Sequence, residues 1–216
     1  MEKNDTLGPA ATSPKEVMRR NIRDALGSKL QQPVSNENLN AANLPPIADV
    51  MQTFVSNFRS KGGKCKICDN SMIMSFMVQF LKAQKYERIF CDCPSFFQYF
   101  KSANIPFMSV LSPDFPPDIA VVYADLMIAR SGGFVFSQKY SLYPSHKNLA
   151  SDILIIGSVT RIQPDVHNVL ETLAAEDTKN NTGLVEIVTP QPPEIVDGKE
   201  QYSKLNPRMI LLLADK

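Results

Sequence analysis

The chain has 216 residues, of which 44% are hydrophobic, and 23 basic residues stand against 22 acidic ones. Length and composition fit one globular domain and exclude a disordered chain or a small disulfide-rich scaffold. A net charge of +1 gives no general attraction to nucleic acid or to an anionic membrane, so neither is an expected partner. The longest apolar runs, 119–124 and 209–214, are far shorter than the roughly 20 residues of a membrane helix. Because residues 1–10 also lack the apolar core of a signal peptide, we expect a soluble, cytoplasmic protein.

Residues 1–44 are predicted to form a polar N-terminal arm, and residues 45–216 an α/β domain. All Phe and Tyr residues lie at or beyond Phe54, so the packed core is expected to begin close to residue 45. Within the arm, the sequence Ser-Pro-Lys-Glu at 13–16 has the spacing of a capping box with proline in the first turn, which predicts a helix ending at Gly27. The polar, Asn-rich stretch 31–43 is predicted to be a linker.

Beyond the arm, apolar residues in 47–58 recur at helical spacing and predict an amphipathic helix that ends at Gly62-Gly63. Short apolar runs then alternate with helical stretches, which is typical of parallel strands covered by helices. The predicted fold class is therefore α/β, with a mostly parallel sheet flanked by helices. The predicted strands are 65–68, 87–91, 106–110, 118–123, 133–138, 153–157, 184–188 and 209–213, the last two buried, and the predicted helices are 71–83, 94–102 and 164–175.

In open α/β sheets, ligands bind beyond the carboxyl ends of the strands. We therefore expect the functional groups in the segments 69–71 and 92–94 and in the loops 110–118 and 129–141. Asn70 and Ser71 stand at the first strand-to-helix junction, where such side chains either help to hold an anion at the helix N-terminus or cap the helix.

The four cysteines occur as Cys65-Lys-Ile-Cys68 and Cys91-Asp-Cys93, a spacing that raises the question of a metal or iron–sulfur site. Cys65 and Cys68 fall in a predicted strand, where three residues span ~10 Å and the two side chains point to opposite faces. One metal could not reach both of them, and we expect thiols and no bound metal or cofactor. Cys68 and Cys91 could still approach each other at neighbouring strand ends.

The segment 124–136 contains Ser131-Gly132-Gly133 between apolar runs. Glycines at such a position allow backbone N–H groups to approach a carboxylate or phosphate closely. The alternative interpretation is a tight turn between two strands that requires a positive φ. Asp125 either orients this bend or forms a hydrogen bond within a turn. His146 is a candidate ligand or base, or a loop residue, whereas His167 is expected on the exposed face of its helix.

The segment 124–136 resembles the LUD-domain family, which carries a run like Ala-Asp-x-x-Ile-Ala-Glu-Thr-Gly-Thr before an apolar strand. The family's following basic residue and Ser-Leu-x-Pro are matched by 139–144, and its next strand and helix by 152–157 and 164–173. The resemblance implies a Rossmann-like fold of the NagB/RpiA/CoA-transferase group with an additional layer of strands. It also implies a role beside iron–sulfur partners in the oxidation of L-lactate.

The sequence departs from the family pattern at several of these positions. Arg130 stands where the family often has Glu, which removes a carboxylate from the bend. Ser131 keeps the hydroxyl of the usual Thr, Gly133 loses the second one, and Lys139 replaces an Arg, leaving a point charge in place of a two-pronged donor. The family's C-terminal motifs are reduced to 189–194 and 205–207. The predicted ligand-binding residues are Asn70, Ser71, Asp125, Arg130, Ser131, Gly132, Gly133, Lys139, Ser141 and His146.

Two hypotheses for the function follow. The first is an accessory protein of iron–sulfur-dependent L-lactate oxidation that binds a small anionic ligand or a redox partner. The second is an enzyme of the NagB/RpiA/CoA-transferase-like group acting on a phosphosugar, a CoA ester or a folate-type substrate. Its anion would be held by Arg130 and Lys139, and Asp114, Asp125 or His146 would have to serve as the base.

Overall fold

The computed structural model describes residues 45–112, 114–137, 149–177 and 185–215. The compact unit that contains all the described helices and strands begins at Ile47. The helix predicted in the N-terminal arm lies outside the described residues.

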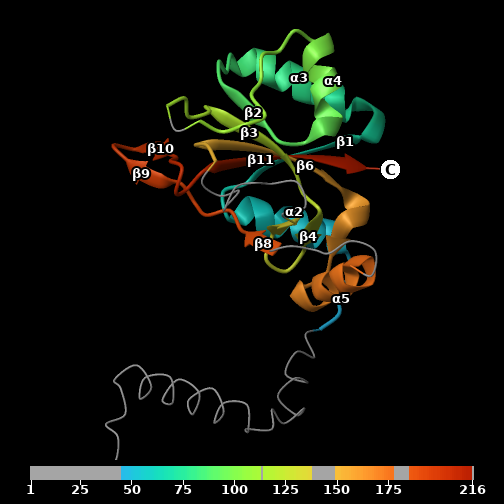
Figure 1. The fold of residues 1–216 in the computed structure, drawn as a ribbon. Helices are drawn as coiled ribbons and strands as arrows, with labels where there is room; N and C mark the ends of the chain where they lie inside the picture. The colour runs from blue at the N-terminus through green and yellow to red at the C-terminus, as the bar shows by residue number, and fades with distance from the viewer. Residues whose placement is uncertain (1–44, 113, 138–148, 178–184, 216) are drawn as a thin grey trace, which may run out of the picture. The chain divides into compact units, whose positions relative to one another are not determined.

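The centre of the molecule is a five-stranded sheet with the order β1-β11-β6-β3-β2, in which every neighbouring pair is parallel (Figure 1). The inner strands are runs of buried apolar residues, as expected where helices or strands cover both faces of a sheet. This arrangement confirms the predicted α/β fold class. The strands are β1 (Lys64–Asp69), β2 (Ile89–Cys91), β3 (Ile119–Tyr123), β6 (Asp152–Ser158) and β11 (Arg208–Asp215).

Alternate side chains of this sheet pack against different layers, because successive residues of a strand point to opposite faces. On one face, Leu154 and Ile156 of β6 pack with helices α3 (Ile73–Gln84) and α4 (Pro94–Ser102). On the other face, Ile153 and Ile155 belong to the core that contains Phe54 and Phe58 of helix α2 (Val50–Ser60). The amphipathic helix predicted from residues 47–58 is therefore α2.

A second, four-stranded sheet with the order β7-β4-β5-β8 lies on the α2 side of the main sheet. Phe134 of β5 packs edge-on against Phe58, with the ring centroids 5.3 Å apart. Helix α5 (Val166–Asp177) packs on the other face of this sheet through Val169 and Leu173. This is the additional strand layer that the resemblance implied. Its strands are β4 (Leu126–Ile128), β5 (Gly133–Ser137), β7 (Ile162–Gln163) and β8 (Val185–Val188).

Two predicted strands differ from the structure. The stretch 106–110 forms no strand, because only Met108 pairs with β2, through hydrogen bonds of 2.8 Å to Ile89 and 2.9 Å from Cys91. The predicted burial of the strand at 184–188 is wrong. It becomes β8 at an edge of the smaller sheet, and the side chains of Val185 and Ile187 are 37% and 47% exposed.

Three smaller elements complete the described chain. The short helices η1 (Asn70–Met72) and η3 (Val159–Arg161) follow β1 and β6. An exposed antiparallel hairpin of β9 (Glu194–Val196) and β10 (Lys199–Gln201) turns at Asp197-Gly198, where both residues have positive φ. None of the described helices is long and apolar enough to cross a membrane.

Candidate functional site

The Ser-Gly-Gly segment forms the turn between β4 and β5. Gly132 has a φ of +61°, a conformation that favours glycine. Its N–H points to the carbonyl oxygen of Ala129 at 3.4 Å, and the N–H of Gly133 donates to the Ser131 hydroxyl at 3.2 Å. Both glycine amides are therefore engaged inside the turn, and this differs from the expectation that they face a ligand. The geometry is that of the alternative interpretation, a tight turn with a positive φ.

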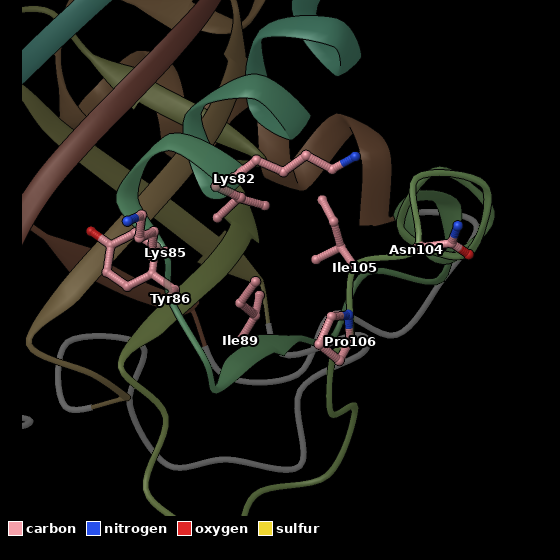
Figure 2. A pocket seen from close by; sticks show the side chains of 8 residues that line it. Lys82, Lys85, Tyr86, Ile89, Asn104, Ile105 and Pro106 are labelled. Atoms are coloured by element: carbon pink, nitrogen blue, oxygen red, sulfur yellow. The ribbon is translucent and has the colours of Figure 1, made fainter.

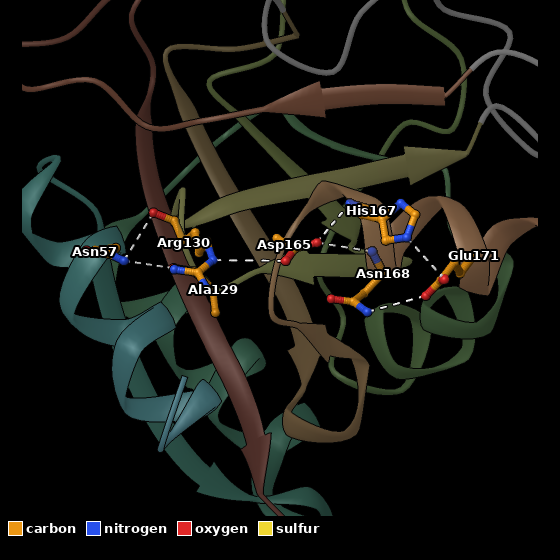
Figure 3. Close-up of polar contacts among 7 residues, drawn as sticks. All are labelled: Asn57, Ala129, Arg130, Asp165, His167, Asn168 and Glu171. Atoms are coloured by element: carbon orange, nitrogen blue, oxygen red, sulfur yellow. Dashed lines mark hydrogen bonds and ion pairs between the residues drawn. The ribbon is translucent and has the colours of Figure 1, made fainter. Parts of the chain in front are cut away.

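Helix α2 holds this turn from the core side (Figure 3). The Asn57 side-chain amide donates to the carbonyl oxygens of Ala129 at 2.8 Å and Arg130 at 3.2 Å. The Lys61 ammonium donates to the carbonyl oxygen of Ser131 at 2.7 Å. Gly132 lies so close to α2 that a Cβ atom there would stand 2.6 Å from the backbone nitrogen of Phe58. The bend is therefore packed closely against α2, and the carbonyl groups of residues 129–131 accept hydrogen bonds from Asn57 of this helix and from Lys61, which directly follows it.

Arg130 and Asp165 join the same turn to helix α5 (Figure 3). Arg130 Nε lies 4.0 Å from Asp165 Oδ2. The other oxygen of Asp165 accepts the N–H groups of His167 at 2.9 Å and Asn168 at 3.2 Å, so Asp165 caps the N-terminus of α5. His167 is 79% exposed, as predicted, and forms an i,i+4 pair with Glu171.

The predicted ligand-binding residues do not share one end of the main sheet. Asn70 and Ser71 follow the carboxyl end of β1, where both are exposed. The Ser131 turn contacts Lys61, which lies three residues before the amino end of the same strand. The two ends of a six-residue strand are about 17 Å apart. The prediction that this bend lies among the loops at the carboxyl ends of the strands is therefore wrong. After β3 ends, β4 leads the chain away from the carboxyl edge of the main sheet.

The other predicted residues are distributed as follows. Asp125 lies at the start of β4, at the opposite end of that strand from Ser131. Its N–H donates to Val135 at 3.0 Å, and its carbonyl oxygen accepts from Arg161 at 2.8 Å. Helix α3 begins without a side-chain cap, so neither Asn70 nor Ser71 caps it. Lys139, Ser141 and His146 lie outside the described residues, and their role in binding remains a prediction.

The carboxyl edge of the main sheet presents carboxylates and hydroxyls. Asp69 and Asp215 are paired in register at the ends of β1 and β11, and both are exposed. Ser158 at the end of β6 lies 2.9 Å from the Thr160 hydroxyl. Within the described ranges, no group of three or more His, Cys, Asp or Glu side chains is placed to hold a metal. The described part of this edge is thus suited to hydrogen bonding more than to binding an anion by charge.

The cysteine side chains separate as the strand geometry predicts. Cys65 packs with the core on the α2 side of the sheet, and Cys68 with the core on the α3 side. Burial raises the pKa of the Cys65 thiol to about 11, although Arg59 opposes this, and raises that of Cys91 to about 12. The suggestion that Cys68 and Cys91 approach each other is wrong, because β1 and β2 lie at opposite edges of the sheet.

The sequence analysis did not identify a charged network at the amino end of the main sheet. Asp152 begins β6 and Arg208 begins β11; the two carboxylate oxygens of Asp152 accept from Arg208, with Nε at 3.0 Å from Oδ1. The Tyr86 hydroxyl donates to Asp152 and accepts from Arg208 Nη2 at 3.0 Å. A signal was present in the sequence, since Asp152 and Arg208 each begin a long apolar run.

Comparison with known proteins rests on structure alone. No family model and no curated protein matches the chain. Among solved structures, it is similar to a DUF162 family protein from Deinococcus radiodurans, with a TM-score of 0.58, 10% identity, and coverage of 78% of this chain and 99% of that chain. A ribose 5-phosphate isomerase from Plasmodium falciparum aligns with a TM-score of 0.32 and 12% identity over 72% of this chain and 77% of that chain. The chain therefore shares the fold of the DUF162 protein across nearly the whole length of that protein.

Proposed function

We propose that this chain is an accessory protein of the LUD type, which acts beside iron–sulfur subunits in the oxidation of L-lactate and binds a small anionic ligand or a redox partner. The observation that carries the proposal is the fold. DUF162 corresponds to the LUD domain, and the match to the DUF162 protein includes 99% of its length. The resemblance of residues 124–144 to the LUD pattern points to the same family independently of the fold.

The arrangement of the bend favours an accessory role over a catalytic one. Where the family often has Glu, this chain has Arg130, and its guanidinium faces Asp165 at the start of α5. The Ser131 hydroxyl accepts a hydrogen bond from Gly133, and the neighbouring carbonyl groups are bound by Asn57 and Lys61. In the described part of the turn these side chains serve to stabilise it, and the position of the family's Glu carries a cation in place of a carboxylate.

Affinity purification from the native host at native expression level tests the proposal. Cells are grown on L-lactate and lysed under mild conditions, and iron–sulfur oxidoreductase subunits are expected to co-purify. A deletion strain is expected to grow slowly on L-lactate and normally on glucose, and the intact gene restores growth. Recovery of the chain without such subunits, together with unchanged growth on L-lactate, would contradict the proposal.

A panel of ligands separates this proposal from the enzyme hypothesis. Thermal denaturation is followed with lactate, pyruvate, sugar phosphates, CoA and nucleotides. Stabilisation by CoA or a sugar phosphate, lost in Lys139→Ala and retained in Lys199→Ala on the exposed β10 strand, would favour an enzyme. Binding of lactate or pyruvate alone fits the accessory role.

A further inference from the structure

The β9–β10 hairpin forms a two-stranded sheet of its own, and Figure 1 shows it projecting beyond the amino end of the main sheet. Every residue of its two strands is exposed. The apolar side chains of Ile195 and Val196 are 66% and 40% exposed. A two-stranded hairpin without a packed face is only marginally stable in water. A surface that covers this hairpin would therefore stabilise it.

The hairpin is acidic. In the segment 194–200, the carboxylates of Glu194, Asp197 and Glu200 stand against the ammonium group of Lys199, which leaves a net charge of −2. Ile195 pairs with Glu200 across the two strands, so an exposed apolar side chain and a carboxylate share one face of the hairpin. Among the residues that the structure describes, none of these three carboxylates forms an ion pair.

The segment 59–68, which includes most of strand β1, has the opposite charge. It contains four basic residues and no acidic one, a net charge of +4: Arg59, Lys61, Lys64 and Lys66. Strand β1 lies at an edge of the main sheet, and the side chain of Ile67 is 38% exposed there. An exposed edge strand is a place where another chain can add to a sheet.

The cations of the segment 59–68 have neutral partners within the described ranges. Arg59 Nη2 donates to the carbonyl oxygen of Cys65 at 3.1 Å, and Lys61 donates to a carbonyl oxygen of the β4–β5 turn. Lys66 Nζ lies 3.5 Å from the centroid of the Phe76 ring. Because none of these partners is a carboxylate, the positive charge of this segment is not compensated.

The hairpin and the basic segment begin side by side on the same molecule. A Cβ atom at Gly62 would stand 3.2 Å from the Cδ atom of Pro193. Gly62 lies two residues before β1, and Pro193 directly precedes β9. Two complementary surfaces that are neighbours on one molecule can both be matched by a second copy related by a two-fold axis.

We propose that two copies of this chain form a symmetric dimer in which the hairpin of each copy lies along β1 of the other. Glu194 and Glu200 face the cations of the segment 59–68, and Ile195 is removed from water. Contacts of hairpin with hairpin, or of β1 with β1, would bring like charges together, so the exchanged arrangement is favoured over both. The dimer does not depend on the proposed function.

The first test is sedimentation velocity of the full-length chain over a series of micromolar concentrations. We expect a species of twice the mass of the chain, in an equilibrium that sodium chloride shifts toward the monomer, because salt screens the exposed charges. A monomer at every concentration would overturn the proposal. A ladder of larger species would also overturn it, because a contact that is not reciprocal produces open assemblies.

Charge-reversal variants test the exchanged arrangement. Glu194→Lys/Glu200→Lys and Lys64→Glu/Lys66→Glu are each expected to raise the dissociation constant of the dimer about tenfold. An equimolar mixture of the two variants is expected to form a mixed dimer, since a basic hairpin then meets an acidic β1 and an acidic hairpin meets a basic one. Circular dichroism confirms that each variant is folded. Absence of the mixed dimer between folded variants would overturn the proposal.

An apolar variant gives an answer that does not depend on the charged ones. Ile195→Ser changes an exposed side chain and is expected to weaken the dimer about fivefold, whereas Val110→Ser, at a position 69% exposed outside the hairpin, is expected to leave it unchanged. Lys82→Glu/Lys85→Glu is the control for charge. Figure 2 shows both lysines near Ile89 of β2, which lies at the opposite edge of the main sheet from β1. An unchanged dimer in Ile195→Ser, or equal weakening in the controls, would refute the interface.

Discussion

The β4–β5 turn and the amino edge of the main sheet are both stabilised by polar contacts between distant parts of the chain. The contacts differ in kind: the turn is held by hydrogen bonds to backbone carbonyl groups, and the amino edge by contacts between charged and polar side chains. At the turn, the neutral amide of Asn57 in α2 and the ammonium of Lys61, which follows this helix, donate to backbone carbonyl groups. Gly132 allows the backbones of the turn and of α2 to approach each other. At the amino edge, the carboxylate of Asp152 is bound by the Arg208 guanidinium and the Tyr86 phenol.

This difference determines which change each region tolerates. The turn depends on shape and backbone conformation, so it is sensitive to the size of a side chain and insensitive to pH. The amino edge depends on charge in a partly buried environment, so it is sensitive to the loss of one partner and to titration. Four substitutions test whether the two regions differ in this way.

The largest effect is expected for Gly132→Ala. A left-handed conformation costs a non-glycine residue ~1–2 kcal/mol, and the new Cβ would also stand 2.6 Å from the Phe58 nitrogen, so backbone has to move. We expect a loss of about 3 kcal/mol in the free energy of unfolding, measured by urea denaturation. Gly198→Ala is the control, since its φ is +73° and nothing lies within 4 Å of a Cβ there. It should cost about 1 kcal/mol. Equal losses would show that the contact with α2 contributes nothing.

At the amino edge, Asp152→Asn keeps the shape of the side chain and removes its charge. Arg208 then retains a partly buried charge without its partner, and we expect a loss of about 2 kcal/mol by urea denaturation. The matched control is Asp118→Asn, whose partner Arg88 is 45% exposed on its side chain and readily solvated. A loss as small as that in the control would mean that the network at Asp152 behaves like an ordinary surface ion pair.

The parallel core could be predicted from sequence because strands such as β6 and β11 are long apolar runs whose burial needs no knowledge of distant residues. Strands β4 and β7 have three and two residues, too few for any periodicity to be recognised. The stretch 106–110 has the composition of a strand, but a single pairing of Met108 with β2 is all that its geometry allows.

The glycine bend shows the same limit within the candidate site. The Ser-Gly-Gly pattern at 131–133 correctly indicated that the backbone here approaches another group closely. What it approaches is α2, through Asn57, which lies 72 residues before Ala129 in the chain. No local sequence pattern encodes that contact. The sequence therefore could not show whether the bend approaches a ligand or a helix. The Tyr86–Arg208 pairing, with a separation of 122 residues, was hidden for the same reason.

A smaller effect at the turn is expected for Asn57→Ala. This variant removes two hydrogen bonds to the carbonyl groups of Ala129 and Arg130, which lie in a part-buried environment. We expect a loss of about 1 kcal/mol in the free energy of unfolding, without a change in its pH dependence between pH 5 and pH 9. Ser60→Ala serves as the control, because its hydroxyl makes only a local, exposed bond within α2. A pH-dependent loss in Asn57→Ala would show that the turn also depends on charge.

The smallest effect is expected in alkaline solution for Tyr86. Burial, and then the hydrogen bond to Asp152, raises the pKa of the Tyr86 phenol above its usual value of 10.0. The folded state therefore keeps a proton that the unfolded state releases, so the contribution of the phenol to stability is complete below pH 10 and is lost as the pH rises above it. The urea midpoint of the native chain should fall more steeply between pH 9 and pH 11 than that of Tyr86→Phe. Tyr99→Phe, at an exposed position on α4, is the control and should follow the native chain. If the urea midpoints of the native chain and of Tyr86→Phe fall in parallel as the pH rises, the protonated phenol of Tyr86 does not contribute to the stability of the amino edge.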